Sequence, residues 1–316
     1  MAYEAFDDDT LGFTTRQLHA GYDPAEHDRS KAVPIYQTAA FELGDYDRCV
    51  RLFDYSEEGH SYVRFSNPTN SVLEKRISSL EGGAAAVSFA SGMAAISGTF
   101  FNLCNAGDQI VAVKTLYGGS TSLLEHILPD YGITCSFVEN EDDPASFERA
   151  ITPKTKALIL NSPSNPTGMI YSRQHLEDLA QVCLEADLYV IADEMYSKLI
   201  FDGKEFVSFP TLSEAVKAHT ILVNGASKTY AMTGWRIGFA AASREITQVM
   251  NNYLSHSLSG TCSIAQAAAA EAFGGPQEEI EAMRQAFETR RNYLYDRMSQ
   301  IPGVHPVRSE ATFYML

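Results

Sequence analysis

Short apolar runs alternate with stretches of helical periodicity through the middle of the chain. The stretches at 91–103, 120–128, 145–151 and 173–186 favour amphipathic helices. The apolar runs favour strands at 84–90, 109–113, 133–138, 156–160, 188–192 and 220–224. Strands that alternate with helices predict an α/β fold with a mostly parallel sheet flanked by helices on both faces. Ligands of such sheets bind beyond the carboxyl ends of the strands.

The first part of the chain carries a different pattern. Prolines and scattered aromatic residues predict an irregular arm over residues 1–61. This arm either wraps a partner subunit or is a solvated tail. After it, Asn70 or Thr69 is expected to cap a helix that ends before Gly82.

The last part of the chain is mostly helical, with helices predicted at 245–258, 263–273 and 277–300. We expect the third helix to cross from a large domain to a smaller one. Its apolar stripe consists of Ile280, Met283, Phe287, Tyr293 and Met298. Residues 312–316 indicate a strand cut short. The expected division is an arm at 1–61, a large α/β domain at 62–275, and a long helix with the start of a truncated small domain at 276–316.

Composition narrows the possible partners. The chain has 316 residues and a formal net charge of −16, which argues against nucleic acid or an anionic membrane as a partner. No stretch approaches the roughly 20 apolar residues of a membrane span, and the acidic start, residues 1–10, has no apolar run typical of a signal peptide. The five cysteines are an odd number without close pairs, which favours a reduced cytoplasm and indicates neither a disulfide framework nor a metal site.

One lysine stands out among small residues. Lys228 follows the apolar run 220–224 and lies within residues 225–238, which also contain Arg236. Burying an ammonium group is costly unless the group is paired or used in chemistry. One interpretation is that Lys228 forms a Schiff base with pyridoxal phosphate (PLP) while Arg236 holds a phosphate or carboxylate. The alternative is a surface lysine in a loop, with Arg236 in a structural ion pair.

Several residues at strand ends suit the remaining needs of PLP. Asp193 ends an apolar run and would pair with the ring nitrogen, although a helix-capping aspartate is the alternative. Tyr196 and Asn165 would hydrogen-bond the phenolic oxygen, although the sequence around Asn165 is also that of an ordinary turn. Tyr117 is a candidate for stacking on the ring.

The phosphate requires backbone N–H groups, hydroxyls and cations. A strand, a Ser-Gly turn and a helix start present free N–H groups to an anion, although most such turns only cap a helix. The residues that would surround the phosphate are Ser91, Gly92, Met93, Ser227 and Arg236. Tyr62 and Arg64 are two positions apart on an extended segment, so they share a side and can reach one phosphate. The alternative is an exposed aromatic and a rim arginine.

From about Asn161 onward the chain resembles class I aminotransferases of the aspartate aminotransferase type. Three features carry the resemblance: the turn Asn165-Pro-Thr-Gly168, the pair Asp193 and Tyr196, and the stretch 225–238, which is similar to that family's lysine signature. The resemblance implies that these residues bind PLP and that Lys228 is the catalytic base.

From about residue 14 to residue 160 the chain resembles instead the Cys/Met-metabolism family of PLP enzymes, particularly O-acetylhomoserine sulfhydrylase. The motifs are Leu18-His-Ala-Gly21, Val33-Pro-Ile-Tyr-Gln-Thr38, Tyr62-Val-Arg64, Leu80-Glu-Gly-Gly83, Ala90-Ser-Gly-Met-Ala-Ala95 and Leu116-Tyr-Gly-Gly119. This resemblance implies that Tyr62 and Arg64 reach the cofactor phosphate of a neighbouring subunit and that Tyr117 stacks on the ring. It therefore implies a homodimer or a dimer of dimers.

Both families share fold type I of PLP-dependent transferases, so a chimera joined near Asn161 would still form one sheet. Both also continue into a small domain whose arginine holds the substrate carboxylate, and no residue here matches that arginine. The resemblances imply an aminotransferase acting on an amino acid such as aspartate. Two alternatives are an O-acetylhomoserine sulfhydrylase-like enzyme and an inactive PLP-binding protein.

Overall fold

The computed structural model describes residues 10–54 and 56–316, so the expectation for the first residues, 1–9, lies outside the described part. One sheet forms its centre, in the spatial order β1-β7-β6-β5-β4-β2-β3. The strands are β1 Ala85–Phe89, β2 Gln109–Ala112, β3 Thr134–Phe137, β4 Thr155–Asn161, β5 Tyr189–Asp193, β6 Thr220–Gly225 and β7 Gly238–Ala242. β7 runs antiparallel to both β1 and β6, and all other pairs are parallel. The predicted mostly parallel sheet is confirmed.

β7 is the one strand of this sheet that the apolar runs did not predict. Its sequence is Gly-Phe-Ala-Ala-Ala, and glycine and alanine have low strand propensity. β7 forms because it fills the space between β1 and β6, where all five of its residues are buried. Tertiary packing therefore overrides local preference at this position.

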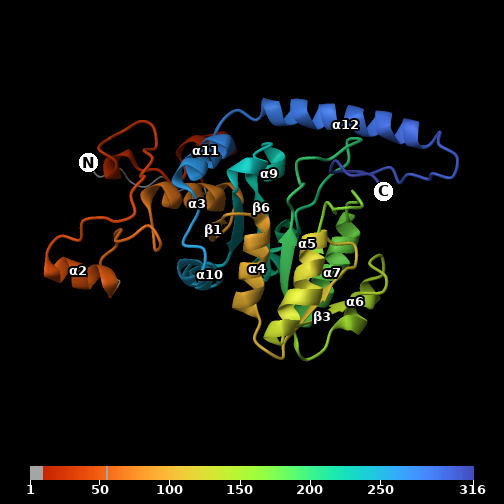
Figure 1. Cartoon of the computed structure of the whole chain (residues 1–316), viewed down its shortest axis with the longest axis horizontal. Coiled ribbons are helices and arrows are strands. Elements are labelled where there is room, and N and C mark those ends of the chain that lie inside the picture. The colour runs from red at the N-terminus through yellow and green to blue at the C-terminus, as the bar shows by residue number, and fades with distance from the viewer. Residues whose placement is uncertain (1–9, 55) are drawn as a thin grey trace.

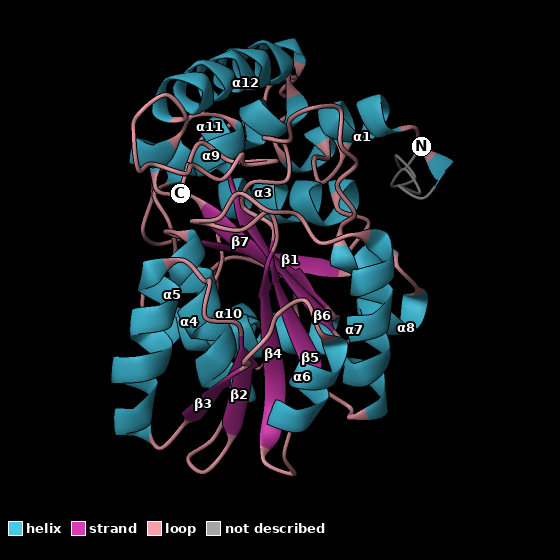
Figure 2. Ribbon diagram, turned by 90° about the vertical axis from the view of Figure 1, so that its right-hand side faces the viewer, coloured by secondary structure: helices cyan, strands magenta, loops and turns pink. Residues whose placement is uncertain are grey.

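Helices cover both faces of the sheet, as the alternating pattern predicts. Figure 2 shows α4, α5 and α10 on one side and α6, α7 and α8 on the other, with α12 across the end of the sheet. The helices are α1 Phe13–His19, α2 Tyr46–Phe53, α3 Pro68–Leu80, α4 Gly92–Leu103, α5 Gly118–Ser122, α6 Pro144–Ala150, α7 Arg173–Glu185, α8 Glu214–Ala218, α9 Ala226–Thr229, α10 Arg244–His256, α11 Ser263–Gly274 and α12 Glu278–Met298. The predicted helix at 120–128 begins as α5 and continues as a π-helical turn at Leu123–Ile127.

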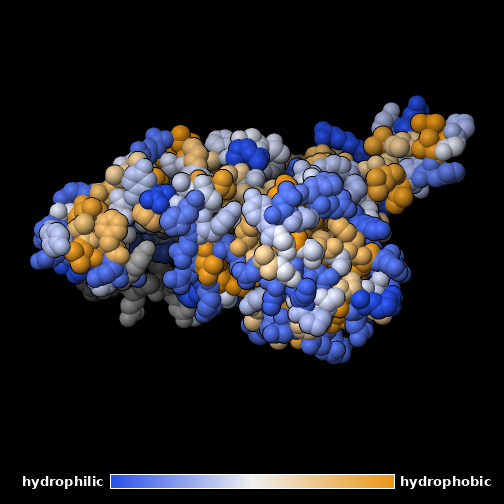
Figure 3. Space-filling view, turned by 60° about the horizontal axis from the view of Figure 1, so that its bottom comes forward, coloured by the Kyte–Doolittle hydropathy of each residue, from blue (hydrophilic) through white to orange (hydrophobic). Residues whose placement is uncertain are grey.

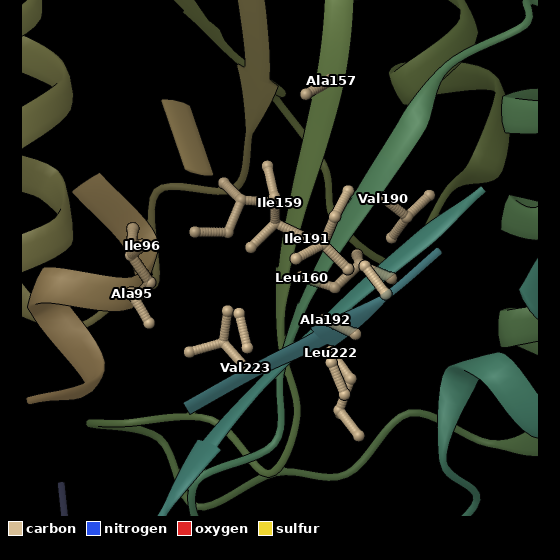
Figure 4. Packing of buried hydrophobic residues seen from close by; sticks show 14 of the residues in the cluster. Ala95, Ile96, Ala157, Ile159, Leu160, Val190, Ile191, Ala192, Leu222 and Val223 are labelled. Carbon is tan, nitrogen blue, oxygen red and sulfur yellow. The ribbon is translucent and has the colours of Figure 1, made fainter. Parts of the chain in front are cut away.

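The core lies between the central strands and α4. Figure 4 shows Ile159 of β4, Ile191 of β5 and Val223 of β6 on the side where α4 contributes Ala95 and Ile96. All five side chains are buried. Strands buried on both faces are expected to be continuous apolar runs, which is why the sequence pattern located these strands.

The cap of α3 differs from the expectation. The side chain of Asn67 accepts a hydrogen bond from the backbone N–H of Thr69 at 2.9 Å, so Asn67 is the cap and the prediction of Asn70 or Thr69 is wrong. The reason is Pro68, which suits the first helical position and disfavours helical geometry at the residue before it. The hydroxyl of Thr69 instead accepts a hydrogen bond from the backbone N–H of Tyr36.

The described part of the arm contains the short helices α1 and α2 and a 3-10 turn at Pro24–Glu26, so it is less irregular than predicted. Gln17 of α1 is buried and donates to the carbonyl of Phe273, which excludes a solvated tail for this part of the arm. α2 lies at the left end of the molecule in Figure 1. Hydrophobic residues gather at that end in Figure 3, and Tyr46, Val50 and Phe53 of α2 are exposed.

α12 is present as predicted, but its apolar stripe does not form a core. Within α12, all of which is described, Arg291 is the buried residue, whereas Tyr293 of the predicted stripe is 68% exposed. Polar contacts attach the helix to the loop after β5. Arg291 forms an ion pair with Asp202 at 2.8 Å, and Arg284 donates to the carbonyl of Ile200 at 3.1 Å.

The prediction of a strand at 312–316 is wrong. Ala311 alone makes an isolated antiparallel bridge, with Ile200. The backbone N–H groups of Glu310 and Ala311 both donate to the carbonyl of Gly168, and that of Thr312 donates to Leu199. Neither Gly168 nor Leu199 belongs to a strand, so the single bridge does not extend into a ladder. Within residues 10–54 and 56–316, no helix is long and apolar enough to cross a bilayer.

A close backbone approach joins β7 to the start of α4. Gly238 pairs with Phe89 on β1 and with Gly225 on β6. A Cβ atom on Gly238 would lie 2.5 Å from the backbone nitrogen of Gly92 and from the carbonyl carbon of Ser91. Only glycine allows α4 to begin this close to the sheet.

We expect Gly238→Ala to lower the free energy of unfolding by about 1–3 kcal/mol, because the backbone of α4 must move away from β7. Urea denaturation measures the loss. Gly118→Ala is the matched control, since a Cβ there meets nothing within 4 Å. Equal stabilities for the two variants would contradict the role of this contact.

Candidate functional site

The register of three parallel strands brings candidate side chains to one edge of the sheet. Asn161 at the end of β4 pairs with Asp193 at the end of β5, and Asp193 pairs with Val223 of β6. β6 ends at Gly225, and α9, which carries Lys228, begins at the next residue. Asp193 and Lys228 therefore emerge from neighbouring strands at their carboxyl ends.

Asp193 is a buried carboxyl group. It is 7% exposed, and burial raises its pKa to about 6, although hydrogen bonds from the Met195 backbone and the Asn161 side chain oppose this shift. The bond from the Met195 N–H measures 3.4 Å, so the capping alternative accounts for only a weak contact. Among the described residues, no lysine or arginine forms an ion pair with Asp193. A buried carboxyl without a cation suits a positively charged ligand atom.

Tyr196 is hydrogen-bonded and lies near Lys228. Its hydroxyl accepts a hydrogen bond from Nδ2 of Asn165 at 3.2 Å and lies 3.2 Å from the hydroxyl of Tyr314. Burial and then the hydrogen bond with Tyr314 hold the pKa of Tyr196 above its ordinary value, so the phenol is protonated at neutral pH. The Nζ atom of Lys228 lies 5.8 Å from the ring centroid of Tyr196 and 5.3 Å from that of Phe313. The lysine thus faces aromatic rings rather than a carboxylate.

The start of α4 lies beside this group. The hydroxyl of Ser91 accepts a hydrogen bond from the Ala94 N–H at 3.0 Å and so caps the helix. A Cβ on Gly92 would lie 2.6 Å from Cε of Met195, two residues after Asp193. Met93 follows at the second helical position, and its sulfur accepts a hydrogen bond from Ser120 of α5. The N-terminal N–H groups of α4 are therefore near the ends of β5 and β6, where they would attract an anion.

The other predicted residues differ in how closely they join this group. Tyr117 directly precedes α5, is 44% exposed, and lies at the same end of the sheet. Ser227 is half-buried in the first turn of α9 beside Lys228. Arg236 is exposed, with left-handed backbone geometry, and its guanidinium donates to the carbonyl of Thr233 at 2.8 Å. Among the described residues, Arg236 makes neither the structural ion pair nor a hydrogen bond with α4.

Tyr62 and Arg64 lie near each other and near α10. The guanidinium carbon of Arg64 is 4.3 Å from the ring centroid of Phe65 and 6.0 Å from that of Tyr62. Arg64 also donates to the carbonyl of Ser255 in α10 at 3.3 Å. Within the described part of the chain, neither residue hydrogen-bonds to the group around Lys228. Tyr62 is exposed, which is compatible with a role toward another subunit.

Two polar residues of this site were not predicted from the sequence. Asn161 accepts a hydrogen bond from the Asn165 N–H at 2.8 Å and donates to the carbonyl of Asp193 at 3.3 Å. Its position at the end of an apolar run was a usable signal, because the same rule identified Asp193. Tyr314 carried no such signal, since it lies 118 residues from its partner Tyr196.

Fold and site together define the class of this protein. A mostly parallel sheet with a lysine after β6 and a buried acid at the end of β5 is the arrangement of fold type I PLP-dependent transferases. The chain belongs to the family of class I and II aminotransferases, whose model matches residues 47–316. This match extends across Asn161, so both sides of the expected join lie within one family, and the join itself stays a prediction.

The chain is also similar to individual proteins of known sequence or structure. The aspartate aminotransferase of Geobacillus stearothermophilus is 50% identical over 172 residues, which are 54% of this chain and 44% of that protein. The structure of MetB from Corynebacterium glutamicum matches 95% of this chain and 72% of its own, with a TM-score of 0.74 at 21% identity. A Campylobacter jejuni protein described as an O-acetylhomoserine (thiol)-lyase matches 94% and 78%, with a TM-score of 0.72 at 23% identity. The matched segment thus spans less than half of the first relative, and the two structures share the fold.

Glu194 is a second buried carboxyl, next to Asp193. It is 5% exposed, and its oxygens accept hydrogen bonds from the Ser208 hydroxyl at 2.7 Å and the Phe209 N–H at 2.8 Å. Burial raises its pKa to about 8 from an ordinary value of 4.5. Glu194 thereby ties the end of β5 to the loop at 208–209.

The raised pKa values predict a pH dependence of stability. Between pH 4.5 and about 8 the folded state retains the Glu194 proton that the unfolded chain has lost, and Asp193 acts likewise between 3.8 and about 6. The free energy of unfolding therefore falls as pH rises through this range, by roughly a few kcal/mol. Glu74, whose pKa burial raises to about 7, contributes in the same way below pH 7. We expect Glu194→Gln to make the fall between pH 6 and 8 shallower, as measured by urea denaturation.

Glu205→Gln serves as the control for that experiment, because the Glu205 side chain is 81% exposed. It should keep the slope of the unmodified protein. A Glu194→Gln protein with the same slope as the unmodified chain would show that Glu194 is already ionised at neutral pH.

Proposed function

We propose that this chain binds PLP through Lys228 and acts as an aminotransferase on an amino acid such as aspartate. The observation that carries the proposal is the grouping of Asp193, Tyr196 and Lys228 at the carboxyl ends of β5 and β6, with a buried acid that has no described cationic partner. The named activity of the Geobacillus relative supports the reaction and the substrate.

The donor set suits PLP at each of its polar atoms. Asp193 would hold a proton on the ring nitrogen, and its burial makes that charge pair favourable. Tyr196 and Asn165 would hydrogen-bond the phenolic oxygen. Tyr117 would cover one face of the ring. The phosphate would be held by Ser91, Gly92, Met93, Ser227 and Arg236.

When bound, PLP supplies an electron sink for the substrate Cα. Lys228 would first anchor the aldehyde and then, once its amine is free, accept and return the Cα proton. The rings of Tyr196 and Phe313 lie within 6 Å of the Lys228 Nζ atom and would limit water at that nitrogen. Tyr196, which is protonated at neutral pH, would donate to the phenolic oxygen rather than accept from it.

An absorption experiment tests the proposal. The purified chain should gain a visible band with PLP. Borohydride should abolish this band and leave a pyridoxyl group covalently attached to the protein, whereas Lys228→Ala should retain no covalent pyridoxyl group. In an unreduced sample, aspartate should remove the band with release of about one equivalent of a 2-oxo acid. A covalently attached pyridoxyl group in the reduced Lys228→Ala protein would contradict the assignment of the lysine.

The other candidates are separate outcomes of the same experiment. The likeness to the MetB and O-acetylhomoserine (thiol)-lyase structures favours an O-acetylhomoserine sulfhydrylase-like reaction as the second candidate. Sulfide-dependent homocysteine formation from O-acetylhomoserine, with no response to aspartate, would support it. A band that is stable to every amino acid would indicate an inactive PLP-binding protein.

We also propose that the chain forms a homodimer, or a dimer of dimers, in which Tyr62 and Arg64 reach the phosphate bound by the other subunit. The exposure of Tyr62 supports this, as does the contact of Arg64 with α10 rather than with the described residues around Lys228. Reduced cysteines, none of them in a disulfide, support a cytoplasmic location.

Arg64→Ala should raise the dissociation constant for PLP about tenfold, the effect of one lost charge-assisted hydrogen bond. Fluorescence titration of the apoprotein with PLP measures it. Arg149→Ala is the matched control, because that side chain is 64% exposed on α6 and pairs with Asp143. Equal affinities for the two variants would place Arg64 outside the site.

A further inference from the structure

Three side chains from distant parts of the chain form one hydrogen-bonded group. Nδ2 of Asn165 lies 3.2 Å from the Tyr196 hydroxyl, which lies 3.2 Å from the Tyr314 hydroxyl. Asn165 and Tyr196 already have roles in the proposed function, on which this inference rests. Tyr314 has none, and its hydroxyl contacts the group that would face the phenolic oxygen of the cofactor.

Tyr314 is held by the segment 309–314, which we term the strap. The strap is attached to the same two loops that carry its partners. The N–H groups of Glu310 and Ala311 donate to Gly168, in the turn of Asn165, and both bonds measure 2.9 Å. On the other side, the Thr312 N–H donates to Leu199, three residues after Tyr196, at 2.9 Å.

Close packing and charge hold the strap in place. A Cβ on Gly168 would lie 2.4 Å from Cβ of Ser309, and Gly168 has a φ of +69°, so the contact requires glycine. The side chain of Glu310 forms an ion pair with Lys204. Ser309, Ala311 and Thr312 are fully buried. These contacts fix the backbone from which Tyr314 extends.

The rings themselves are also packed against one another. The Tyr314 ring meets the Tyr196 ring edge-on, with centroids 6.0 Å apart and planes at 78°. Phe313 meets Tyr196 in the same way at 5.6 Å. The two hydroxyls therefore stay within hydrogen-bond distance without help from a bound ligand.

The direction of these hydrogen bonds is limited by chemistry. An amide nitrogen can only donate, so the Tyr196 oxygen accepts from Asn165 and its own proton remains free to donate. Two arrangements follow. Either Tyr196 donates to Tyr314, or Tyr314 donates to Tyr196 and leaves the Tyr196 proton for a third acceptor. The exchange between them rotates two O–H bonds and transfers no proton between residues.

We propose that Tyr314 is a positioning residue that donates to Tyr196 when a ligand oxygen occupies the site and so turns the Tyr196 proton toward that oxygen. A phenol that accepts two hydrogen bonds is a stronger donor through its own O–H, because hydrogen bonds polarise one another along a chain. Tyr196 then stabilises the ionised form of the ligand's phenolic oxygen more strongly. Without a ligand, Tyr314 accepts from Tyr196 and keeps that proton satisfied.

Tyr314→Phe tests this with the ring contacts retained. The measured quantity is the pH midpoint of the absorption change of the PLP-bound protein. This midpoint reports the ionisation of the bound PLP chromophore, which the hydrogen bonds at its phenolic oxygen influence. We expect the midpoint to rise by about half a unit, and the dissociation constant for PLP to rise about threefold, as for one lost neutral hydrogen bond. Tyr196→Phe should raise the midpoint further, because it removes the direct donor.

The double variant separates positioning from a structural effect. If Tyr314 acts through Tyr196, Tyr314→Phe should add nothing to the midpoint in a Tyr196→Phe background. Tyr293→Phe is the matched control, because Tyr293 is 68% exposed on α12, and it should match the unmodified protein.

Two results would overturn the inference alone: an unshifted midpoint for Tyr314→Phe, or an equal shift with and without the Tyr196 hydroxyl. An unmodified protein that gains no visible band with PLP would overturn the proposed function and this inference together.

Discussion

The pairing register of β4, β5 and β6 is the constraint on which the candidate site depends. Asn161, Asp193 and the residues leading to Lys228 meet because their strands end at one edge of the sheet. A slip of one residue would turn every side chain of a strand to the opposite face. Ile159, Ile191 and Val223 are fully buried in a closely packed core, where a slip would replace them with side chains of other shapes and is therefore opposed. The packing of the core therefore also determines the geometry of the site.

The same edge contains two consecutive buried carboxyls that are satisfied differently. Glu194 receives hydrogen bonds from Ser208 and Phe209, so it serves the fold by holding the loop after β5. The Asp193 carboxyl accepts only a long hydrogen bond from the Met195 N–H and one from the Asn161 side chain. Burial raises the pKa of both groups. The Asp193 carboxyl is therefore less well hydrogen-bonded than that of Glu194. This difference separates a carboxyl that can accept a ligand from one that stabilises the fold.

The elements that could be predicted from the sequence are those with a strong hydrophobic pattern. Strands buried on both faces were continuous apolar runs, so six of the seven were located. Tyr117, Asn165, Asp193 and Lys228 were expected at or after the ends of four strands, and they lie there in the fold, while their roles stay predictions. β7 was missed because glycine and alanine have low strand propensity. This strand forms because it fills the space between β1 and β6. Arg236 was harder to place, because its side chain follows a left-handed turn that no spacing rule encodes. Tyr62 and Arg64 carried no periodic signal either, and Arg64 contacts the carbonyl of Ser255 in α10 rather than the group around Lys228.

The strap shows why the remainder of the site could not be read from local patterns. Its backbone N–H groups donate to Gly168 and Leu199, which lie outside helices and strands, so neither strand periodicity nor helical periodicity marks it. It is also coupled to α12, because Asp202 binds Arg291 of the helix as well as Arg308 just before the strap. The long helix, whose own surface is largely exposed, is thus attached to the segments around the site through charged contacts rather than through an apolar face.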